Sequence, residues 1–506
     1  MPDADNDAKA CVRSPFDTEH LKTGLRGRSV RGGVATMLGQ GAHFIIHTAS
    51  TIILARLLTP SDFGLIAMVT AVTGFASLFK DLGLSAATIQ KAEITHEQIS
   101  TLFWVNVAVS TLIALVTAAL APAIALFYAE PRLVLITLAL SLVFLFGGLT
   151  VQHQALLQRQ MRFTALAAIQ VISILAGVIA AIAAAARGVG YWTLVIMQVV
   201  NAMFIFLGVW LICGWRPGLR VRGSGVLAMV KFGGHITGFD IVNYFARNLD
   251  NILLGRFWGA STLGLYSRAY NIMMLPINQI RVPLNNVAMS ALSHLQNDPI
   301  RFKRYYIKLI TLIAFIAMPL MVFLFVCGDQ VIYLLLGSQW SGAIVIFKIL
   351  CINAFIQPTM STGGLVLISL GQSKRYLTVG IINSIIIVIS FVFGLPWGAT
   401  GIATAYTIAT YVILVPTLWY SYRRSPIRTR DFFSAILRPV IASAMMGFGI
   451  FVFRLYLTGV SSFVSIGCSF IIGFLTYIAV LFFIPGGLSL LREFFSYRSF
   501  LFQKSP

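Results

Sequence analysis

Charged residues are scarce in this chain. Asp, Glu, Lys and Arg make up 10% of its 506 residues, whereas they form about a quarter of a soluble globular domain. Hydrophobic residues reach 58%, and the mean hydropathy is +0.87. This composition excludes a disordered chain, a fibrous protein and an ordinary soluble enzyme. It indicates a protein with many membrane-spanning segments.

Motifs for catalysis and metal binding are also missing. The sequence has no GxxxxGK(S/T) phosphate loop and no HExxH pair, so it predicts neither ATP hydrolysis nor a zinc hydrolase site. The cysteines are far apart and form no CxxC, which predicts no metal centre and no disulfide framework. They are Cys11, Cys213, Cys327, Cys351 and Cys468. No cofactor and no enzymatic activity are expected.

Acidic residues are the scarcer of the two charged types. The chain has 16 Asp and Glu against 37 Lys and Arg, a net charge of +21. In a soluble protein this excess would suggest nucleic acid as a partner. In a membrane protein, positive residues collect in cytoplasmic loops, so no nucleic acid partner is expected. We expect the basic run 423–430 to act as a topology signal and to contact anionic lipids.

Apolar runs predict about fourteen helical spans. Runs such as 112–126 and 471–484 are continuous and too long for the alternating strands of a membrane barrel. Val331–Gly337 is too short to span, so 331–370 is reduced to one kinked helix. The predicted spans are 34–54, 63–79, 101–127, 133–153, 165–186, 191–213, 234–255, 263–290, 306–327, 343–370, 377–395, 400–420 and two helices within 436–484, which break near 459–462.

The positive charges fix the orientation of these spans. With the amino terminus in the cytoplasm, 28 of the 37 Lys and Arg fall in inside segments, and five fall in or near outer ones. Such a bias predicts that both termini are cytoplasmic. The chain starts with polar, acidic residues and lacks the apolar stretch of a secretory signal. Residues 1–30 are therefore predicted to be a disordered cytoplasmic tail.

An internal repeat relates residues 51–66 to residues 251–266 without a gap. Six spans separate the two copies, an even number, so the halves have the same orientation. Parallel repeats are typical of transporters with a substrate site between the halves. The identical pairs are Ile52/Ile252, Leu54/Leu254, Arg56/Arg256, Ser61/Ser261, Gly64/Gly264 and Leu65/Leu265, with Gly33/Gly233 upstream. The predicted parts are an N-terminal six-helix bundle at 31–215, a cytoplasmic linker at 216–232, a C-terminal six-helix bundle at 233–422, two additional helices at 423–485 and a cytoplasmic tail at 486–506.

Polar residues inside the seventh span lie on one arc of about 100°. They are Asp240, Asn243, Arg247, Asp250 and Asn251. The matching positions of the first span are also polar, namely Gln40, His43, His47, Ser50 and Thr51. Polar groups within spans usually face the bundle interior or a water-filled cavity. The two related helices are therefore predicted to present polar stripes to a shared cavity.

The eighth span adds more polar groups, and two prolines there would free backbone carbonyls. The additions are Arg268, Asn271, Asn278, Gln279, Arg281, Asn285 and Asn286. A cationic cavity suits an anionic substrate, and arginine binds phosphate with two parallel hydrogen bonds. The predicted substrate-binding residues are Arg247, Arg268, Arg281, Lys348, Asn243, Asn251 and Asn271.

The predicted ion-coupling residues are Asp240, Asp250, His43 and His47. Structural readings stay open for the same residues. Arg247 could form ion pairs with Asp240 or Asp250 within its own helix. The two histidines could make interhelical hydrogen bonds. No metal ligand set is expected.

Five strings carry a family resemblance: ILARLLTPSDFGLIAM, LFKDLGLSAATIQK, ISTLFWVN, RNLDNILLGRFWGASTLGLYSRAY and LPINQIRVPL. They resemble the polysaccharide transporter (Wzx-like) branch of the MOP flippase superfamily, and in particular its colanic-acid-exporter-like members. The likeness runs from about Arg31 to Arg424. It implies two six-helix bundles facing each other in a V, plus two C-terminal helices. Arg247 and Arg268 match the family's usual basic positions.

The resemblance also implies a function. Undecaprenyl-pyrophosphate-linked oligosaccharides would move from the cytoplasmic to the periplasmic leaflet of the bacterial inner membrane by ion-coupled alternating access. The implied partners are membrane lipids, a polysaccharide polymerase and a chain-length regulator. The protein itself is expected to be a monomer. The alternative is a MATE-like drug antiporter, whose cavity would favour carboxylates for cationic drugs. A membrane glycosyltransferase or polymerase would need catalytic carboxylates near an interface.

Overall fold

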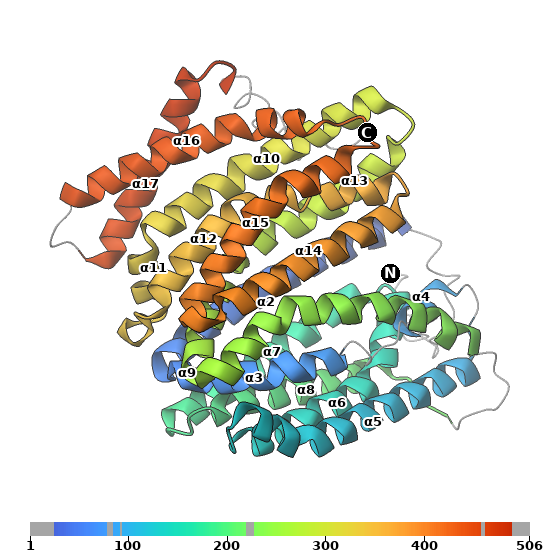
Figure 1. The fold of residues 1–506 in the computed structure, drawn as a ribbon. Helices are drawn as coiled ribbons and strands as arrows, with labels where there is room; N and C mark the ends of the chain where they lie inside the picture. Colours follow the sequence, from blue (N-terminus) through green and yellow to red (C-terminus); the bar gives the residue numbers. More distant parts are fainter. Residues whose placement is uncertain (1–24, 78–83, 92–93, 219–226, 457–460, 488–506) are drawn as a thin grey trace, which may run out of the picture. The chain divides into compact units, whose positions relative to one another are not determined.

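The computed structural model describes residues 25–77, 84–91, 94–218, 227–456 and 461–487. The side chains at 25–30, 86–87, 227–243 and 245–247 lie outside this description. Most of the two predicted tails and residues 219–226 of the predicted linker are outside it too. In the part described, all regular secondary structure is helical (Figure 1), which confirms the all-α class.

Contacts divide the chain into two compact units, Met1–Ala260 (unit 1) and Ser261–Pro506 (unit 2). The first part of helix α9 (Leu227–His294) groups with unit 1. There the Tyr244 hydroxyl donates to the carbonyl oxygens of Thr70 and Ala71, 3.0 Å away in each case. The two units are defined by which residues contact each other. The predicted bundles at 31–215 and 233–422 are defined by the order of the helices along the chain, so the units do not test them and the predicted division stays a prediction.

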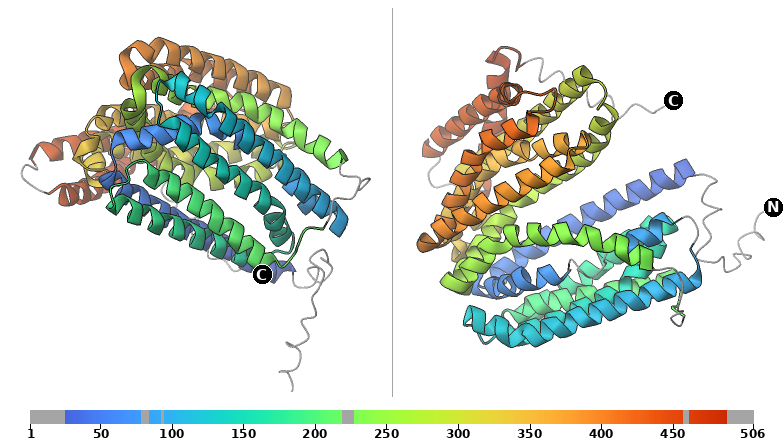
Figure 2. Two further views of the ribbon diagram at one scale, coloured as in Figure 1. Left: turned by 90° about the horizontal axis from the view of Figure 1, so that it is seen from below. Right: turned by 45° about the vertical axis from the view of Figure 1, so that its right-hand side comes forward.

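Unit 1 is a bundle of long helices. Helix α2 packs on α7, α5 packs on α6, and α8 packs on both α6 and α7 (Figures 1 and 2). The bounds are α2 Leu25–Leu57, α3 Pro60–Ser77, α4 Leu84–Gln90, α5 His96–Tyr128, α6 Leu133–Arg159, α7 Phe163–Ala186 and α8 Trp192–Cys213.

Local sequence signals set the limits of α5. Thr95 and Gln98 form a reciprocal capping box at its start, which satisfies backbone N–H groups that have no helical partner. Ala129 takes a left-handed conformation directly after its end. Within the α5–α6 contact, a Cβ at Gly148 would lie 2.5 Å from Cβ of Ser110. Small residues at this seam let the two backbones approach closely, as is common in membrane bundles.

Unit 2 contains the rest of α9 and a second bundle. Helix α10 packs on α12 and α16, α15 packs on α12 and α14, and α16 packs on α17 (Figure 1). The bounds are α10 Pro299–Val326, α11 Gly328–Leu335, η1 Ser338–Trp340, α12 Ala343–Met360, α13 Gly363–Ser369, α14 Ser373–Gly394, η2 Leu395–Trp397, α15 Gly398–Tyr422, α16 Thr429–Tyr456 and α17 Ser462–Phe483.

Nine segments in the described part are long and apolar enough to cross a membrane, and the chain is a multi-pass integral membrane protein. The predicted kinked helix over 343–370 consists of α12 and α13, which two turn residues separate. The predicted seventh and eighth spans are one helical element, α9, with a non-helical residue at Gly259 (φ 77°, ψ 179°).

The two repeat copies break at matching positions. Helix α2 ends at Leu57 and α3 begins at Pro60, while the break in α9 at Gly259 lies 200 residues after Thr59. Burial follows the same order in both copies. Residues 54 and 55 are buried and 56 and 57 exposed, and residues 254–257 repeat this pattern. Four matched positions therefore share their burial, whereas Leu58 is 3% exposed and its counterpart Trp258 is 44% exposed.

Gly64, one of the repeated glycines, provides a stability test. A Cβ at Gly64 would overlap the backbone carbonyl of Ala260, which no side-chain movement can relieve. We expect Gly64→Ala to destabilise the protein by about 1–3 kcal/mol, the usual cost of overpacking. Thermal melting of the purified protein in detergent measures this. Gly41→Ala is the control, because nothing lies within 4 Å of a Cβ there. Equal melting of the two variants would refute the close approach.

Candidate functional site

Three predicted site residues, Asp240, Asn243 and Arg247, lie on the first part of α9 in unit 1. Their side chains are outside the residues that the structure describes. Their predicted roles therefore rest on the sequence alone.

Asp250 and Asn251 lie on α9 two turns before its break. Asp250 is 5% exposed, and its Oδ1 accepts a hydrogen bond from the Asn251 backbone N–H at 2.8 Å. Asn251 Oδ1 is buried and has no donor within the described part. An ionisable residue within a membrane span is a candidate functional residue by default, and here the buried amide oxygen of Asn251 lies next to it in the chain.

His43 and His47 lie on α2 in unit 1, and both are exposed. Their rings stack with centroids 6.1 Å apart and an interplanar angle of 14°. The last two residues of the polar stripe on α2 are bonded within the helix. The hydroxyls of Ser50 and Thr51 both donate to the His47 carbonyl. Exposed imidazoles on a predicted spanning helix fit a hydrated surface, while the hydroxyls are satisfied by their own backbone.

Arg268, Asn271 and Arg281 lie on the second part of α9, in unit 2. Both arginines are partly buried and Asn271 is exposed. Thirteen residues separate Arg268 from Arg281, which is about 20 Å along a helix axis. The two guanidinium groups therefore lie at different depths along the helix. Asn285 Oδ1, one turn beyond Arg281, is buried without a donor in the described residues.

Lys348 belongs to an ion-pair cluster at one end of unit 2. Its Nζ lies 3.8 Å from Oδ1 of Asp329 on α11. The Arg454 guanidinium donates to both Asp329 oxygens, at 2.8 and 3.2 Å, and to the Val326 carbonyl. This cluster joins α16 to α11 and α12. Asp329 is not among the predicted site residues, although it is the sole acid between Pro299 and Arg430.

The charges around Asp329 shift its acidity. Partial burial raises the pKa of the carboxyl, but the hydrogen bonds from Arg454 and the charges of Arg454 and Lys348 outweigh this effect. The pKa therefore lies below its ordinary value, and the carboxylate is the stable form at neutral pH.

A group of buried polar side chains in unit 1 is also absent from the predicted site. Asn106 and Ser110 on α5 and Gln152 and His153 on α6 are at most 1% exposed. In the described part, both amide atoms of Asn106, both ring nitrogens of His153, Ser110 Oγ and Gln152 Nε2 have no hydrogen-bond partner. Each such group costs about 1–3 kcal/mol. The signal available was polar residues within the third and fourth predicted spans.

Aromatic rings surround His153. Trp210 of α8 stacks on the imidazole with centroids 4.6 Å apart, and the rings of Trp215 and Phe103 lie at 5.0 and 5.8 Å. A pocket of about 410 Å³ between α3 and α5 of the same unit is lined almost wholly by apolar side chains such as Leu112 and Val116. None of the predicted cationic residues lines this pocket.

A comparison with protein families matches residues 53–345 to the polysaccharide biosynthesis protein family. Among individual relatives, the chain is 24% identical over 419 residues to the lipopolysaccharide biosynthesis protein WzxC of Escherichia coli, covering 79% of this chain and 84% of that protein. It is 27% identical over 460 residues to the teichuronic acid biosynthesis protein TuaB of Bacillus subtilis, covering 86% and 89%. It is 25% identical over 415 residues to the succinoglycan biosynthesis transport protein ExoT of Rhizobium meliloti, covering 81% and 83%.

Solved structures share the fold. The lipid II flippase MurJ, in an inward closed conformation, aligns with a TM-score of 0.71 and 17% identity, over 89% of this chain and 98% of that one. An inward-facing multidrug resistance MATE transporter of the MOP superfamily aligns with a TM-score of 0.58 and 14% identity, over 76% and 94%. The chain therefore has the fold of MOP superfamily transporters.

The Asp329 cluster predicts a pH dependence of stability. A carboxyl whose pKa is lowered by folding stabilises the protein above its unfolded pKa, about 3.9, and this contribution is lost as the pH falls through the folded pKa. We expect Asp329→Asn to lower the melting temperature at pH 7. The difference from the native protein should shrink as the pH is lowered from 5 toward 3. A difference that stays constant over this range would show that the charge of Asp329 is not what matters.

Proposed function

The chain belongs to the polysaccharide biosynthesis protein family, and from this premise we propose that it is a flippase for lipid-linked oligosaccharides. Its substrate is an undecaprenyl-pyrophosphate-linked repeat unit, which it carries from the cytoplasmic to the periplasmic leaflet for surface or exopolysaccharide synthesis. The observation that carries this proposal is the breadth of the likeness to WzxC, TuaB and ExoT, which spans at least 79% of this chain and 83% of each relative.

The proposed architecture has fourteen spans, which form two parallel six-helix bundles and two C-terminal helices. The protein lies in the bacterial inner membrane, and both of its termini are in the cytoplasm. The matching helix breaks near Thr59 and at Gly259 support the parallel repeat. The excess of Lys and Arg in alternate segments supports the orientation.

The proposed substrate site is cationic. Arg247, Arg268 and Arg281 lie on α9, and arginines at several depths suit a diphosphate that has to cross the membrane while its lipid tail stays in the hydrocarbon. Lys348 contributes less positive charge to this site than the arginines, because Asp329 lies 3.8 Å from it. Asp250 and the exposed pair His43 and His47 are the proposed ion-coupling groups.

A drug antiporter similar to MATE transporters is disfavoured. The likeness to the MATE structure is one of fold at 14% identity, which carries no information on substrate. The arginines of α9 would also repel the cationic compounds that a carboxylate-lined cavity attracts. The polysaccharide transport relatives cover more of this chain.

Deleting the gene tests the function directly. We expect lipid-linked repeat units to accumulate on the cytoplasmic side of the membrane and surface polysaccharide to be lost, because a pyrophosphate head group does not cross hydrocarbon unaided. Extraction and mass spectrometry of the polyprenyl-linked sugars measure the first effect. Normal surface polysaccharide in a strain without a related transporter would contradict the proposal.

Substitutions of α9 test the site. We expect Arg247→Ala and Arg268→Ala to reduce transport at least tenfold, the effect of losing about 1.4 kcal/mol, with membrane abundance unchanged. The corresponding lysine variants should keep part of the activity, because charge remains and the bidentate geometry is lost. Arg301→Ala is the control, since Arg301 is exposed and pairs with Asp298 at 3.2 Å. Full transport by both alanine variants would remove the cationic site.

A further inference from the structure

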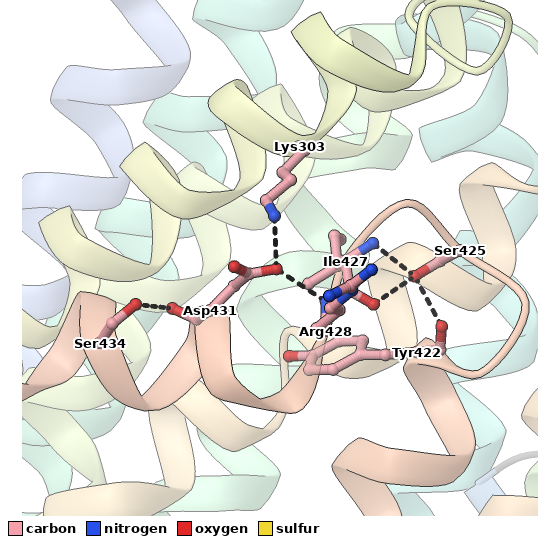
Figure 3. A network of polar contacts seen from close by, with 7 residues as sticks. All are labelled: Lys303, Tyr422, Ser425, Ile427, Arg428, Asp431 and Ser434. Atoms are coloured by element: carbon pink, nitrogen blue, oxygen red, sulfur yellow. Dashed lines mark hydrogen bonds and ion pairs between the residues drawn. The ribbon is translucent and has the colours of Figure 1, made fainter.

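The end of unit 2 where α14 begins and α15 ends carries more positive charge than its acidic residues balance. It lies away from the Asp329 cluster, which follows the end of α10. The basic face, as we define it, consists of five exposed cations: Lys374, Arg423, Arg424, Arg428 and Arg430. The stretch from Gln330 to Arg492 contains a single acidic residue, Asp431. That carboxylate is already engaged, because its Oδ2 lies 2.7 Å from Nζ of Lys303 and accepts from the Arg428 backbone N–H (Figure 3).

Hydrogen bonds hold two turns of the basic face together. Gln372, just before α14, donates from Nε2 to the Arg424 carbonyl at 3.0 Å. The Arg375 guanidinium donates to the Gln372 side-chain oxygen and to the Tyr420 carbonyl, and it stacks over the Tyr420 ring at 4.6 Å. The start of α14 is thereby fixed to the end of α15. These bonds hold the backbone that carries three of the cations, namely Lys374, Arg423 and Arg424.

An exposed apolar stripe on α15 runs up to this face. Ile408, Val412, Val415 and Trp419 are spaced by three or four residues, and each is between 51% and 65% exposed. Arg423 continues the same spacing, and its guanidinium lies 5.3 Å from the centre of the Trp419 ring. A tryptophan below a cation at the end of an apolar helix face is the usual arrangement at a membrane–water interface.

Helix α14 repeats this arrangement beside α15. Thr378, Ile382, Ile385 and Ile389 are exposed at helical spacing, and Lys374 stands one turn before them. The two helices pack together, and Thr417 of α15 donates to Asn383 of α14 at 3.0 Å. They are antiparallel neighbours, so Lys374 and Arg423 lie at the same end of two adjoining apolar stripes. This combination matches a lipid with an anionic head group and apolar chains.

We propose that the basic face and the stripes of α14 and α15 form a binding site for a resident anionic phospholipid of the bilayer. Its phosphate lies between Lys374, Arg423 and Arg424, and its acyl chains lie along Trp419 and the apolar residues below. The predicted topology places this end at the cytoplasmic leaflet, whose surface is negatively charged. The site shares no residue with the arginines of α9 and does not depend on the proposed function.

Lipid binding to the purified full chain in detergent tests this proposal. Native mass spectrometry would follow titration with phosphatidylglycerol or with phosphatidylcholine. We expect preference for phosphatidylglycerol. Because a cation near a lipid surface contributes a factor of about five, Arg423→Gln should weaken phosphatidylglycerol binding about fivefold, and the double variant Lys374→Gln/Arg423→Gln about 25-fold. Phosphatidylcholine binding should be unchanged, which also shows that the variants are folded.

Matched controls make the result decisive. Arg301→Gln removes an exposed cation of the same unit that is already paired with Asp298, and it should change binding by less than about twofold. Arg423→Lys should restore most of the affinity. Native affinity for phosphatidylglycerol in the double variant would overturn the proposal. Competition by undecaprenyl diphosphate that depends on the same two cations would also overturn it, because the surface would then serve the transported lipid.

Discussion

The cost of placing polar groups in hydrocarbon is the constraint on which this structure depends. It requires every backbone N–H and C=O within the membrane to be bonded inside its own segment, and all regular secondary structure in the described residues is accordingly helical. It also restricts the few side-chain charges to pairs, to helix ends or to wet surfaces. Asp329 meets this requirement by binding two cations. Lys303 and Asp431 meet it by pairing at the start of α16 (Figure 3).

The same cost separates the two kinds of polar residue within the spans. Tyr306, Thr362 and Tyr422 are buried but bonded to one another at 2.8 and 2.9 Å, so they fix the packing of unit 2. Asn106 and His153 of unit 1 are equally buried and have no such partners in the described residues. A polar residue in a span is therefore not by itself a sign of function. The partners of its atoms decide between packing and a site.

Much of the fold follows from the sequence because one-dimensional signals control it. Long apolar runs predicted the helices. The residues Gln339–Gly342 predicted the break between the short apolar segment and α12. The kinked helix over 343–370 followed from two signals, the short length of Val331–Gly337 and this break. Pairings across the bundle did not follow, because nothing in the sequence ties Asp329 to Arg454, 125 residues later. Lys348 was assigned to a cavity by its residue type, while its neighbour on α11 decides its charge balance. The roles of Asp240, Asn243 and Arg247 stay predictions, since their side chains are outside the described residues.

The break at Gly259 has a mechanical consequence. Unit 1 ends one residue later, at Ala260, and from there α9 continues as an uninterrupted helical element to His294. The second part of α9 is anchored in unit 2, because Ala288 and Leu292 are buried in the hydrophobic core of that unit. A glycine takes a positive φ at little cost, so the break lets one helical element serve both units without backbone strain. Arg268 and Arg281 are thus held by the packing of unit 2 and not by the first part of the same element.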